Sequence, residues 1–278
     1  MNWWHAILLG IIEGITEYLP VSSTAHLNIA EKLLGYQIDE AGMTAFTAII
    51  QVGAIIAAII YFWADIVRIV VAWFRGLFHA EHRSDPDYRM GWAVIVGSIP
   101  VAIVGLVFKH AIETTLRSMW VIAGALILWS IVMWFADRRT HLTRELDSIT
   151  WRDGLILGGY QALAPLFPGI SRSGATISGG LFRGLTRPAA TRLSFLLGIP
   201  ALVAAGGLES VTQAKNVATN VGWGPTLVAT VVSLVVAYAS IAWLLRFVSH
   251  NKFTGFIVYR VVLGVAIIVM LAMGLVTA

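Results

Sequence analysis

Six runs of predominantly apolar residues alternate with short polar stretches along the chain. They cover residues 42–62, 90–108, 118–136, 188–208, 225–247 and 255–275 and contain few or no charged side chains. The hydrocarbon core of a bilayer is about 30 Å thick, and a helix of about 20 residues spans it. The pattern therefore predicts six transmembrane helices.

Two further apolar stretches, residues 3–34 and 151–186, have a different pattern. Each is interrupted near its centre by proline and by serine with glycine or threonine, which leaves two arms that are too short to cross a bilayer. Interrupted helices are tolerated at membrane depth where they are buried in protein or line a wet cavity. We expect both stretches to form re-entrant helix–turn–helix pairs, which return to the side of the membrane from which they enter.

The two interrupted stretches also resemble each other. A shift of 148 residues aligns Glu13 with Gln161, Pro20 with Pro168 and Ser23 with Ser171, and Phe46 similarly falls near Phe195. One re-entrant pair followed by three spans crosses the membrane an odd number of times, so a second copy would be inverted, with binding sites near the midplane at discontinuous helices. The predicted fold is an all-α integral membrane protein, a single membrane domain over residues 1–278 with inverted repeats at 1–136 and 151–278.

Composition agrees with a membrane protein. Hydrophobic residues make up 58% of the chain and charged residues 12%, and the mean hydropathy is +0.81. The chain has no cysteine, which excludes disulfides and thiolate chemistry. No basic segment followed by a cleavage site opens the sequence, so the apolar segments themselves are expected to direct insertion.

Lys and Arg are distributed unequally between the predicted loops. The face with the termini carries four: Lys32, Lys109, Arg117 and Lys215. The opposite face carries thirteen, at positions 68, 75, 83, 89, 138, 139, 144, 152, 183, 187, 192, 246 and 252. Excess Lys and Arg mark the cytoplasmic side, which explains the net charge of +4 better than a nucleic-acid partner does. We therefore expect both termini outside, and the first re-entrant loop entering from outside.

The stretch EGITEYLPVSSTAH places two carboxylates in the first re-entrant pair. Glu13 and Glu17 are four residues apart, so they share one helix face. Ionisable residues inside a membrane are costly enough to indicate function. The alternative is that both glutamates lie at a wet interface and pair with nearby donors.

Hydroxyls and an imidazole follow in the same stretch. Ser22, Ser23 and Thr24 are placed to cap a helix that runs to about Leu34, with His26 in its first turn. A helix N-terminus favours a phosphate group because it presents unpaired N–H groups and a positive dipole end. The alternatives are an ordinary cap and a satisfied buried histidine.

The second interrupted stretch reads PGISRSGATISGG and is typical of an anion cradle. Gly169 and Gly174 permit close backbone approach, and Arg172 supplies a planar cationic fork suited to phosphate oxygens. Hydroxyl donors come from Ser171, Ser173 and Thr176. The alternative is a helix-packing face with Arg172 paired to a glutamate. Arg260, five residues into the last predicted span, could belong to the site or extend to the interface.

These motifs resemble those of the bacterial undecaprenyl-diphosphatase family, integral-membrane enzymes associated with bacitracin resistance. EGITEYLPVSSTAH is similar to the family's E/Q-x-x-x-E motif and Ser-His stretch, and PGISRSGAT to its P-G-x-S-R-S-x-x-T motif, in the expected order. The resemblance implies hydrolysis of a C55 isoprenyl diphosphate to the monophosphate and phosphate at the outer face of the bacterial plasma membrane, with Mg or Ca. That reaction regenerates the lipid carrier for peptidoglycan.

The resemblance also implies roles for single residues. Glu17, Ser23, His26 and Arg172 would be catalytic, and Glu13 and Glu17 would hold the metal. The substrate-binding set would be Glu13, Ser22, Thr24, Ser171, Ser173, Gly174 and Thr176. Ser23 is the expected nucleophile, with Glu17 or His26 accepting its proton; in the alternative route His26 attacks or activates water.

Two other functions remain open at this stage. A transporter or flippase of an anionic lipid phosphate would also use inverted repeats with broken helices, and a structural membrane partner would leave the buried charges unexplained. The expected partners are the prenyl diphosphate and membrane lipids, without nucleic acid, and a homodimer is left open.

Overall fold

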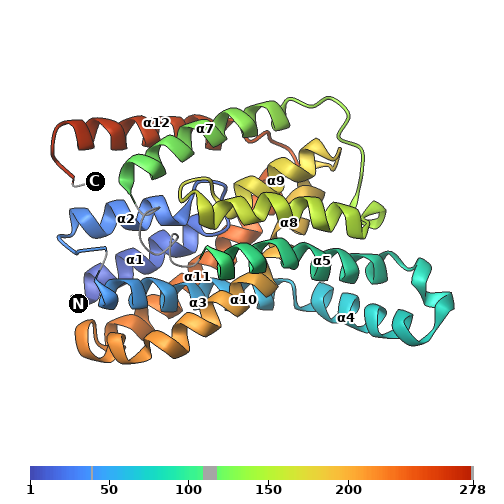
Figure 1. Ribbon diagram of the computed structural model, residues 1–278, viewed down its shortest axis with the longest axis horizontal. Coiled ribbons are helices and arrows are strands. Elements are labelled where there is room, and N and C mark those ends of the chain that lie inside the picture. Colours follow the sequence, from blue (N-terminus) through green and yellow to red (C-terminus); the bar gives the residue numbers. More distant parts are fainter. Residues whose placement is uncertain (39, 109–117, 277–278) are drawn as a thin grey trace.

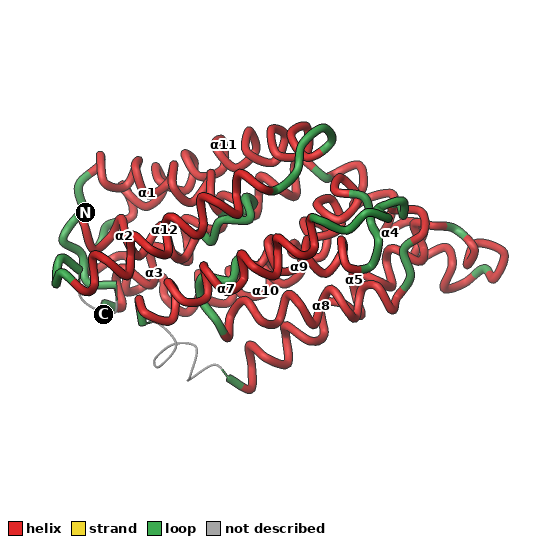
Figure 2. Tube along the Cα trace, turned by 90° about the horizontal axis from the view of Figure 1, so that it is seen from above, coloured by secondary structure: helices red, strands yellow, loops and turns green. Residues whose placement is uncertain are grey.

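The computed structural model describes residues 1–38, 40–108 and 118–276, and in that part of the chain the regular elements are helices (Figure 1). In order they are α1 Trp3–Thr16, α2 Ser23–Leu33, α3 Ala41–Tyr61, α4 Trp63–Phe78, η1 Ala80–Ser84, α5 Pro86–Val107, α7 Met119–Asp137, η3 Leu146–Ser148, α8 Trp151–Leu166, α9 Arg172–Phe182, α10 Arg187–Asn220, α11 Trp223–Val248 and α12 Thr254–Ala272. Both views show the helices running along the long axis of the molecule (Figures 1 and 2).

The six predicted spans are confirmed. Helices α3, α5, α7, α10, α11 and α12 are each long and apolar enough to cross a membrane. Large apolar side chains on them face outward, with Leu128 67%, Val231 61% and Val262 61% exposed, which a hydrocarbon solvent explains. The chain is therefore a multi-pass membrane protein.

Two short helix pairs replace full spans where the sequence is interrupted. Helices α1 and α2 have 14 and 11 residues, and α8 and α9 have 16 and 11. At about 1.5 Å per residue none of the four covers the bilayer core. Figure 1 shows α1 and α2 toward the end that carries both termini, and α8 and α9 extending from the other end toward the middle.

Close glycine contacts join each short pair to the other half of the chain. A Cβ on Gly10 would collide with Ala229 of α11, and one on Gly158 with the backbone of Gly97 in α5. Gly154 meets Ala93 in the same way, so α8 runs parallel to α5. Each first arm thus packs on the second span of the opposite half, an exchange that fits the predicted repeat.

The turns of the two pairs end in the same way, at a serine with a positive φ. The caps of α2 and α9 are Ser22 and Ser171, with φ of 75° and 72°. These serines are 149 residues apart, so the alignment of Ser23 with Ser171 is one residue out of register. The extra residue lies after Pro168, where Gly169 takes a positive φ of 106° that suits glycine.

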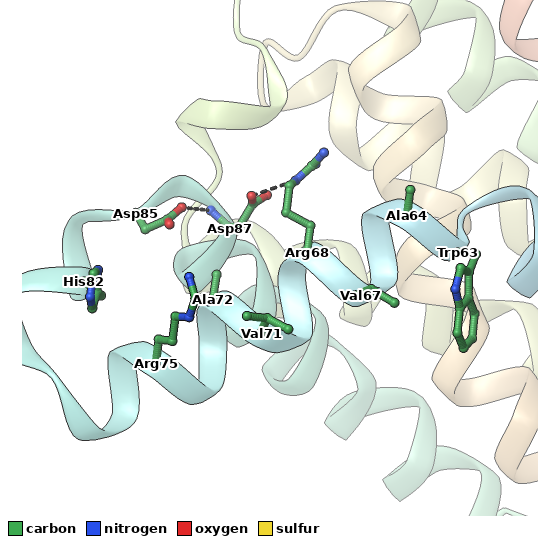
Figure 3. A pocket seen from close by; sticks show the side chains of 10 residues that line it. All are labelled: Trp63, Ala64, Val67, Arg68, Val71, Ala72, Arg75, His82, Asp85 and Asp87. Atoms are coloured by element: carbon green, nitrogen blue, oxygen red, sulfur yellow. Dashed lines mark hydrogen bonds and ion pairs between the residues drawn. The ribbon is translucent and has the colours of Figure 1, made fainter.

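Helix α4 is the element that apolar run length did not predict. It carries Arg68, which pairs with Asp65 and Asp87, while Val67 and Phe74 lie exposed on it. Only one stripe of such a helix is apolar, so it forms no run of about 20 residues. It projects with the start of α5 beyond the bundle (Figure 1). The two segments line an open cavity of about 520 Å³ (Figure 3).

The two ends of the molecule differ in charge. Both termini lie at one end, and the basic segments around α4, the α7–α8 connection and the α11–α12 connection lie at the other (Figure 1). Lys109 and Arg117, assigned to the face with the termini, fall outside the described residues.

Candidate active site

The turns of the two short helix pairs meet inside the bundle. Ser173 Oγ donates to the carbonyl of Leu19 at 3.1 Å. Arg260 is fully buried and donates to the carbonyls of Pro20 at 3.3 Å and Gly169 at 3.0 Å. Arg260 therefore does not extend to the interface; it joins the two turns.

Glu17 contacts more of the predicted site residues than a single ion pair would require. Its Oε2 accepts from Ser23 Oγ at 2.8 Å and from Gln51 Nε2 at 3.4 Å, and its Oε1 accepts from Arg172 Nη2 at 3.3 Å. The side chains of Glu17 and Arg172 are 5% and 12% exposed. This combination brings an acid, a hydroxyl and a guanidinium from both turns into one group.

The sharp turn before α2 positions Ser23. Ser22 has a positive φ, and its Oγ accepts from the backbone N–H of Ala25, which starts the helix. Ser23 is then the first helical residue, beside the open N–H groups of the first turn. Because its hydroxyl proton points at the Glu17 carboxylate, its oxygen has a base in direct contact.

His26 contacts Tyr259 of α12. Its Nδ1 lies 2.8 Å from the Ser22 carbonyl, which only accepts, so Nδ1 carries the proton. In the neutral ring Nε2 then accepts from the Tyr259 hydroxyl at 2.6 Å. The two rings are stacked with centroids 5.5 Å apart. The Ser22 carbonyl therefore fixes the tautomer of the imidazole, and Tyr259 fixes the plane of its ring.

Arg172 lies in a recess made by α10 and by the turn that follows α1. A Cβ on Gly198 would collide with its guanidinium, and the Ser194 carbonyl accepts from Nη1 at 3.4 Å. The guanidinium carbon is 5.9 Å from the centroid of the Tyr18 ring, within reach of a cation–π interaction. Gly198 thus provides space that a larger residue would remove.

The other residues of the predicted cradle mostly support the turn. Ser171 Oγ accepts from the Gly174 N–H at 3.2 Å and lies 3.1 Å from Ser173 Oγ. Thr176 donates to the Arg172 carbonyl at 2.9 Å and contacts the Ser194 hydroxyl. Thr24 is exposed on α2. Of the predicted substrate-binding hydroxyls, those in the second turn are therefore already bonded within the protein.

Glu13 is the predicted metal-binding residue that remains apart from this network. It is 1% exposed, and its Oε1 has no hydrogen-bond partner in the part of the chain that the structure describes. Gln161, its counterpart in the predicted repeat, is also buried, and neither atom of its amide group has a hydrogen-bond partner among the described residues. The described residues contain no cluster of three His, Asp or Glu that could hold a metal, so two carboxylates offer only part of a coordination shell.

Sequence reasoning missed several residues that complete the site. Glu31 is 2% exposed on α2 and accepts from Thr47 at 2.9 Å, so Glu13 and Glu17 are not the only buried acids of the first pair. Gln51 and Tyr259 belong to spans whose other residues are mostly apolar. A polar residue within such a span is the signal that could have indicated Gln51.

Comparison with known proteins finds a matching family model and several relatives. The family model described as "Bacitracin resistance protein BacA" matches residues 6–266. The chain is 67% identical to "Undecaprenyl-diphosphatase" of Cutibacterium acnes, over 284 residues and the full length of both chains. It is 54% identical to "Undecaprenyl-diphosphatase 3" of Frankia casuarinae and 50% identical to "Undecaprenyl-diphosphatase" of Acidothermus cellulolyticus, again over both full lengths. The chain belongs to the family of the bacitracin resistance protein BacA.

Proposed function

We propose that this protein is an enzyme that hydrolyses undecaprenyl diphosphate to the monophosphate and inorganic phosphate. The observation that carries the proposal is the contact of Ser23 and Arg172 with opposite oxygens of Glu17. Hydrolysis needs a nucleophile with a base beside it, and binding of an anionic substrate needs a cation. Translocation of the substrate would need only the cation. The family and its named relatives favour hydrolysis over a transporter.

Ser23 is the proposed nucleophile. Its Oγ transfers a proton to Glu17 and forms a bond to the terminal phosphorus, while the bond from that phosphorus to the bridging oxygen breaks. Undecaprenyl phosphate leaves with the bridging oxygen. Water then attacks the phosphorus of the phosphoserine and gives one proton to a base. The bond from that phosphorus to Ser23 Oγ breaks, inorganic phosphate leaves, and Glu17 returns its proton to Ser23 Oγ.

His26 is the proposed base for the second step. In the neutral ring its Nε2 lone pair faces the Tyr259 hydroxyl, so water must displace that hydroxyl or pass its proton through it. In the alternative route His26 activates water directly against the diphosphate. The distance of 2.8 Å from Ser23 Oγ to Glu17 favours the serine route.

Arg172 and two helix N-termini supply the positive charge that the diphosphate requires. The first turns of α2 and α9 both begin at a positive-φ serine, and helix starts stabilise phosphate oxygens. Arg172 begins α9, so binding of the phosphate would compete with its ion pair to Glu17. That competition would release Glu17 to take the serine proton.

A divalent cation such as Mg or Ca is part of the proposal. The unpartnered Glu13 Oε1 and the Glu17 carboxylate are oxygen donors of the kind that both ions prefer. Glu13 and Glu17 would hold the ion. When bound, it would neutralise phosphate charge.

We further propose that the site opens to the outer face of the bacterial plasma membrane. Support comes from the basic residues gathered at the end opposite the termini. There the reaction would return the lipid carrier to peptidoglycan synthesis and would confer resistance to bacitracin.

The test is phosphate release from undecaprenyl diphosphate by the purified protein. We expect Ser23→Ala to lose roughly a thousandfold or more in kcat. Ser249→Ala, at an exposed serine directly after α11, should match the wild type. EDTA should abolish turnover, and Mg or Ca should restore it. Acid-quenched wild type should carry phosphate on Ser23.

Each part of the proposal would be contradicted by a different result. Full turnover by Ser23→Ala would exclude the serine route, and turnover unchanged by EDTA would exclude the metal. Transport of the intact diphosphate without phosphate release would replace the enzyme with a transporter.

A further inference from the structure

A second charged cavity lies at the end of the bundle opposite the termini, between the first turns of α5 and α8. Its volume is about 810 Å³. It is lined by Tyr88, Arg89, Trp92, Val96, Arg144, Thr150, Trp151, Arg152, Asp153 and Arg183. It shares no residue with the candidate active site, and the proposed reaction does not use it.

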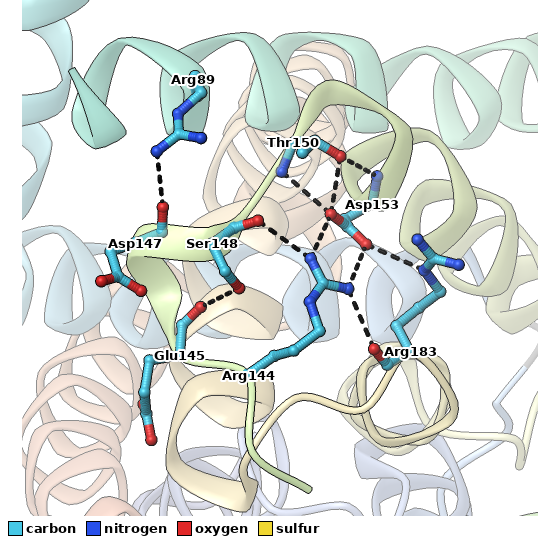
Figure 4. Close-up of polar contacts among 8 residues, drawn as sticks. All are labelled: Arg89, Arg144, Glu145, Asp147, Ser148, Thr150, Asp153 and Arg183. Carbon is cyan, nitrogen blue, oxygen red and sulfur yellow. Dashed lines mark hydrogen bonds and ion pairs between the residues drawn. The ribbon is translucent and has the colours of Figure 1, made fainter. Parts of the chain in front are cut away.

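Two of its four arginines are held by one buried carboxylate. Arg144 donates both terminal nitrogens to Asp153, at 3.0 and 2.9 Å, and Arg183 Nε donates at 3.0 Å (Figure 4). Thr150 adds its backbone N–H and its hydroxyl to the same carboxylate. Asp153 therefore fixes two guanidinium groups in place at the rim of the cavity.

The other two arginines have no carboxylate partner among the described residues. Arg89 Nη2 donates to the backbone carbonyl of Asp147 at 2.9 Å, and its buried Nε has no acceptor. In Figure 4 the Asp147 carboxylate points away from Arg89. Arg152 lies over the Trp151 ring, 5.5 Å from its centroid. Since Asp153 is the one acid in the lining beside four arginines, the lining residues carry a net charge of +3.

Aromatic and apolar surface adjoins these charges. Tyr88 and Trp92 form one wall with Val96, and Trp151 is 50% exposed. Exposed apolar side chains continue from the cavity along both helices toward the bundle centre, with Leu155 42% and Ile99 48% exposed. Aromatic rings favour the headgroup level of a membrane, so the cavity meets the bilayer where headgroup and acyl chain join.

We propose that this cavity binds the phosphate headgroup of an anionic phospholipid. The arginines match phosphate oxygens in charge and geometry, and the apolar track matches an acyl chain. A free phosphate has the same charge but no tail, so it would gain nothing from that track. Basic pockets between transmembrane helices are suited to such headgroups.

The test compares lipid binding by purified full-length protein, using native mass spectrometry in neutral detergent. The probes are phosphatidylglycerol, phosphatidylcholine and inorganic phosphate. We expect the wild type to prefer phosphatidylglycerol. The double variant R89Q/R152Q, which keeps the Asp153 network intact, should lose roughly tenfold or more of that preference, since each basic side chain contributes about fivefold at a lipid surface.

The matched control is R138Q/R139Q. Both arginines are exposed outside the cavity lining, and Arg138 also covers a tryptophan, with its guanidinium carbon 3.9 Å from the Trp134 centroid. This variant should keep the wild-type preference. R152E alone, at an exposed side chain, provides a second variant that should fold normally and also lose it.

Three outcomes would overturn the proposal. The first is equal binding of phosphatidylglycerol and phosphatidylcholine by the wild type. The second is a preference that R89Q/R152Q and R152E retain, which would place the lipid elsewhere, including the active site. The third is displacement of phosphatidylglycerol by a millimolar excess of inorganic phosphate, which would make the cavity a site for a free anion.

Discussion

Arg260 is a buried cation whose acceptors are carbonyl and hydroxyl oxygens. It donates to Pro20 and Gly169 in the two turns, and to Ser130 Oγ and the Leu126 carbonyl on α7. No ion pair with a described acid accompanies it. The residue therefore sets the spacing of the two turns that carry Ser23 and Arg172.

We expect Arg260→Met to lower both thermal stability and turnover. The change leaves the Pro20 and Gly169 carbonyls buried without a donor, at about 1–3 kcal/mol for each group. Thermal unfolding in detergent and phosphate release measure the two effects. Arg246→Met, at an exposed arginine of α11, is the control. A variant as stable and active as that control would contradict the positioning role.

Tyr259 acts on the reaction through His26. Tyr259→Phe keeps the stacked ring but removes the hydrogen bond to Nε2. A hydrogen bond of this kind contributes about 0.5–1.5 kcal/mol, so kcat should fall about 2–10-fold with little change in KM. Tyr238→Phe, at another partly exposed tyrosine of a span, should have no effect. An unchanged kcat would show that the imidazole needs no fixed orientation.

At the scale of the element, Asp153 ties α8 to its neighbours. The carboxylate is fully buried and binds Arg144 of the α7–α8 connection and Arg183 at the end of α9. Burial alone would raise the pKa of Asp153, but the hydrogen bonds from Arg144, Thr150 and Arg183 outweigh it and hold the pKa well below its ordinary value. The ionised form is thus favoured by folding.

The pH dependence of stability follows from that shift. A lowered pKa in the folded protein stabilises it fully above the ordinary aspartate pKa of about 3.9, and the contribution is lost as the pH falls toward the folded-state value. Asp153→Asn should be less stable than the wild type at neutral pH, and the gap in unfolding temperature should narrow in acid. Asp147→Asn, at an exposed acid, is the control. A gap that stays constant with pH would contradict this account.

The sequence predicts elements best where one local property decides them. Apolar run length decides the six spans, and a central proline with serines marks the two interrupted pairs. Neither property predicts α4, whose apolar residues occupy one stripe. Neither predicts the extension of α10 to Asn220, where the helix continues past the predicted end at residue 208 as a largely polar segment.

The candidate site follows the same division. Glu17, Ser23 and Arg172 stand out because they are polar in apolar surroundings. Three of the acceptors of Arg260 are backbone carbonyls, the most distant of them 240 residues away along the chain. Tyr259 contacts His26 across 233 residues. Such contacts depend on how the two halves pack, which periodicity along the chain does not encode.

On the scale of the whole molecule, function depends on which end faces outward. The Ser23 turn belongs to the helix pair nearer the termini, while the lipid-binding cavity lies among the arginines at the other end. If the basic end is cytoplasmic, as the positive-inside rule requires, the two sites face opposite leaflets. The reversed orientation would place hydrolysis on the inner side.

The absence of cysteine makes that orientation directly measurable. Gln37 is exposed between α2 and α3 near the termini, and Thr140 is exposed after α7 at the basic end. A membrane-impermeant maleimide added to intact cells should label Gln37→Cys, and should label Thr140→Cys only after the membrane is permeabilised. Equal thermal stability of both variants is the control. The reverse labelling pattern would place the termini inside and remove the argument for an outward-facing active site, because the same thirteen basic residues would then lie on the side that the charge rule disfavours.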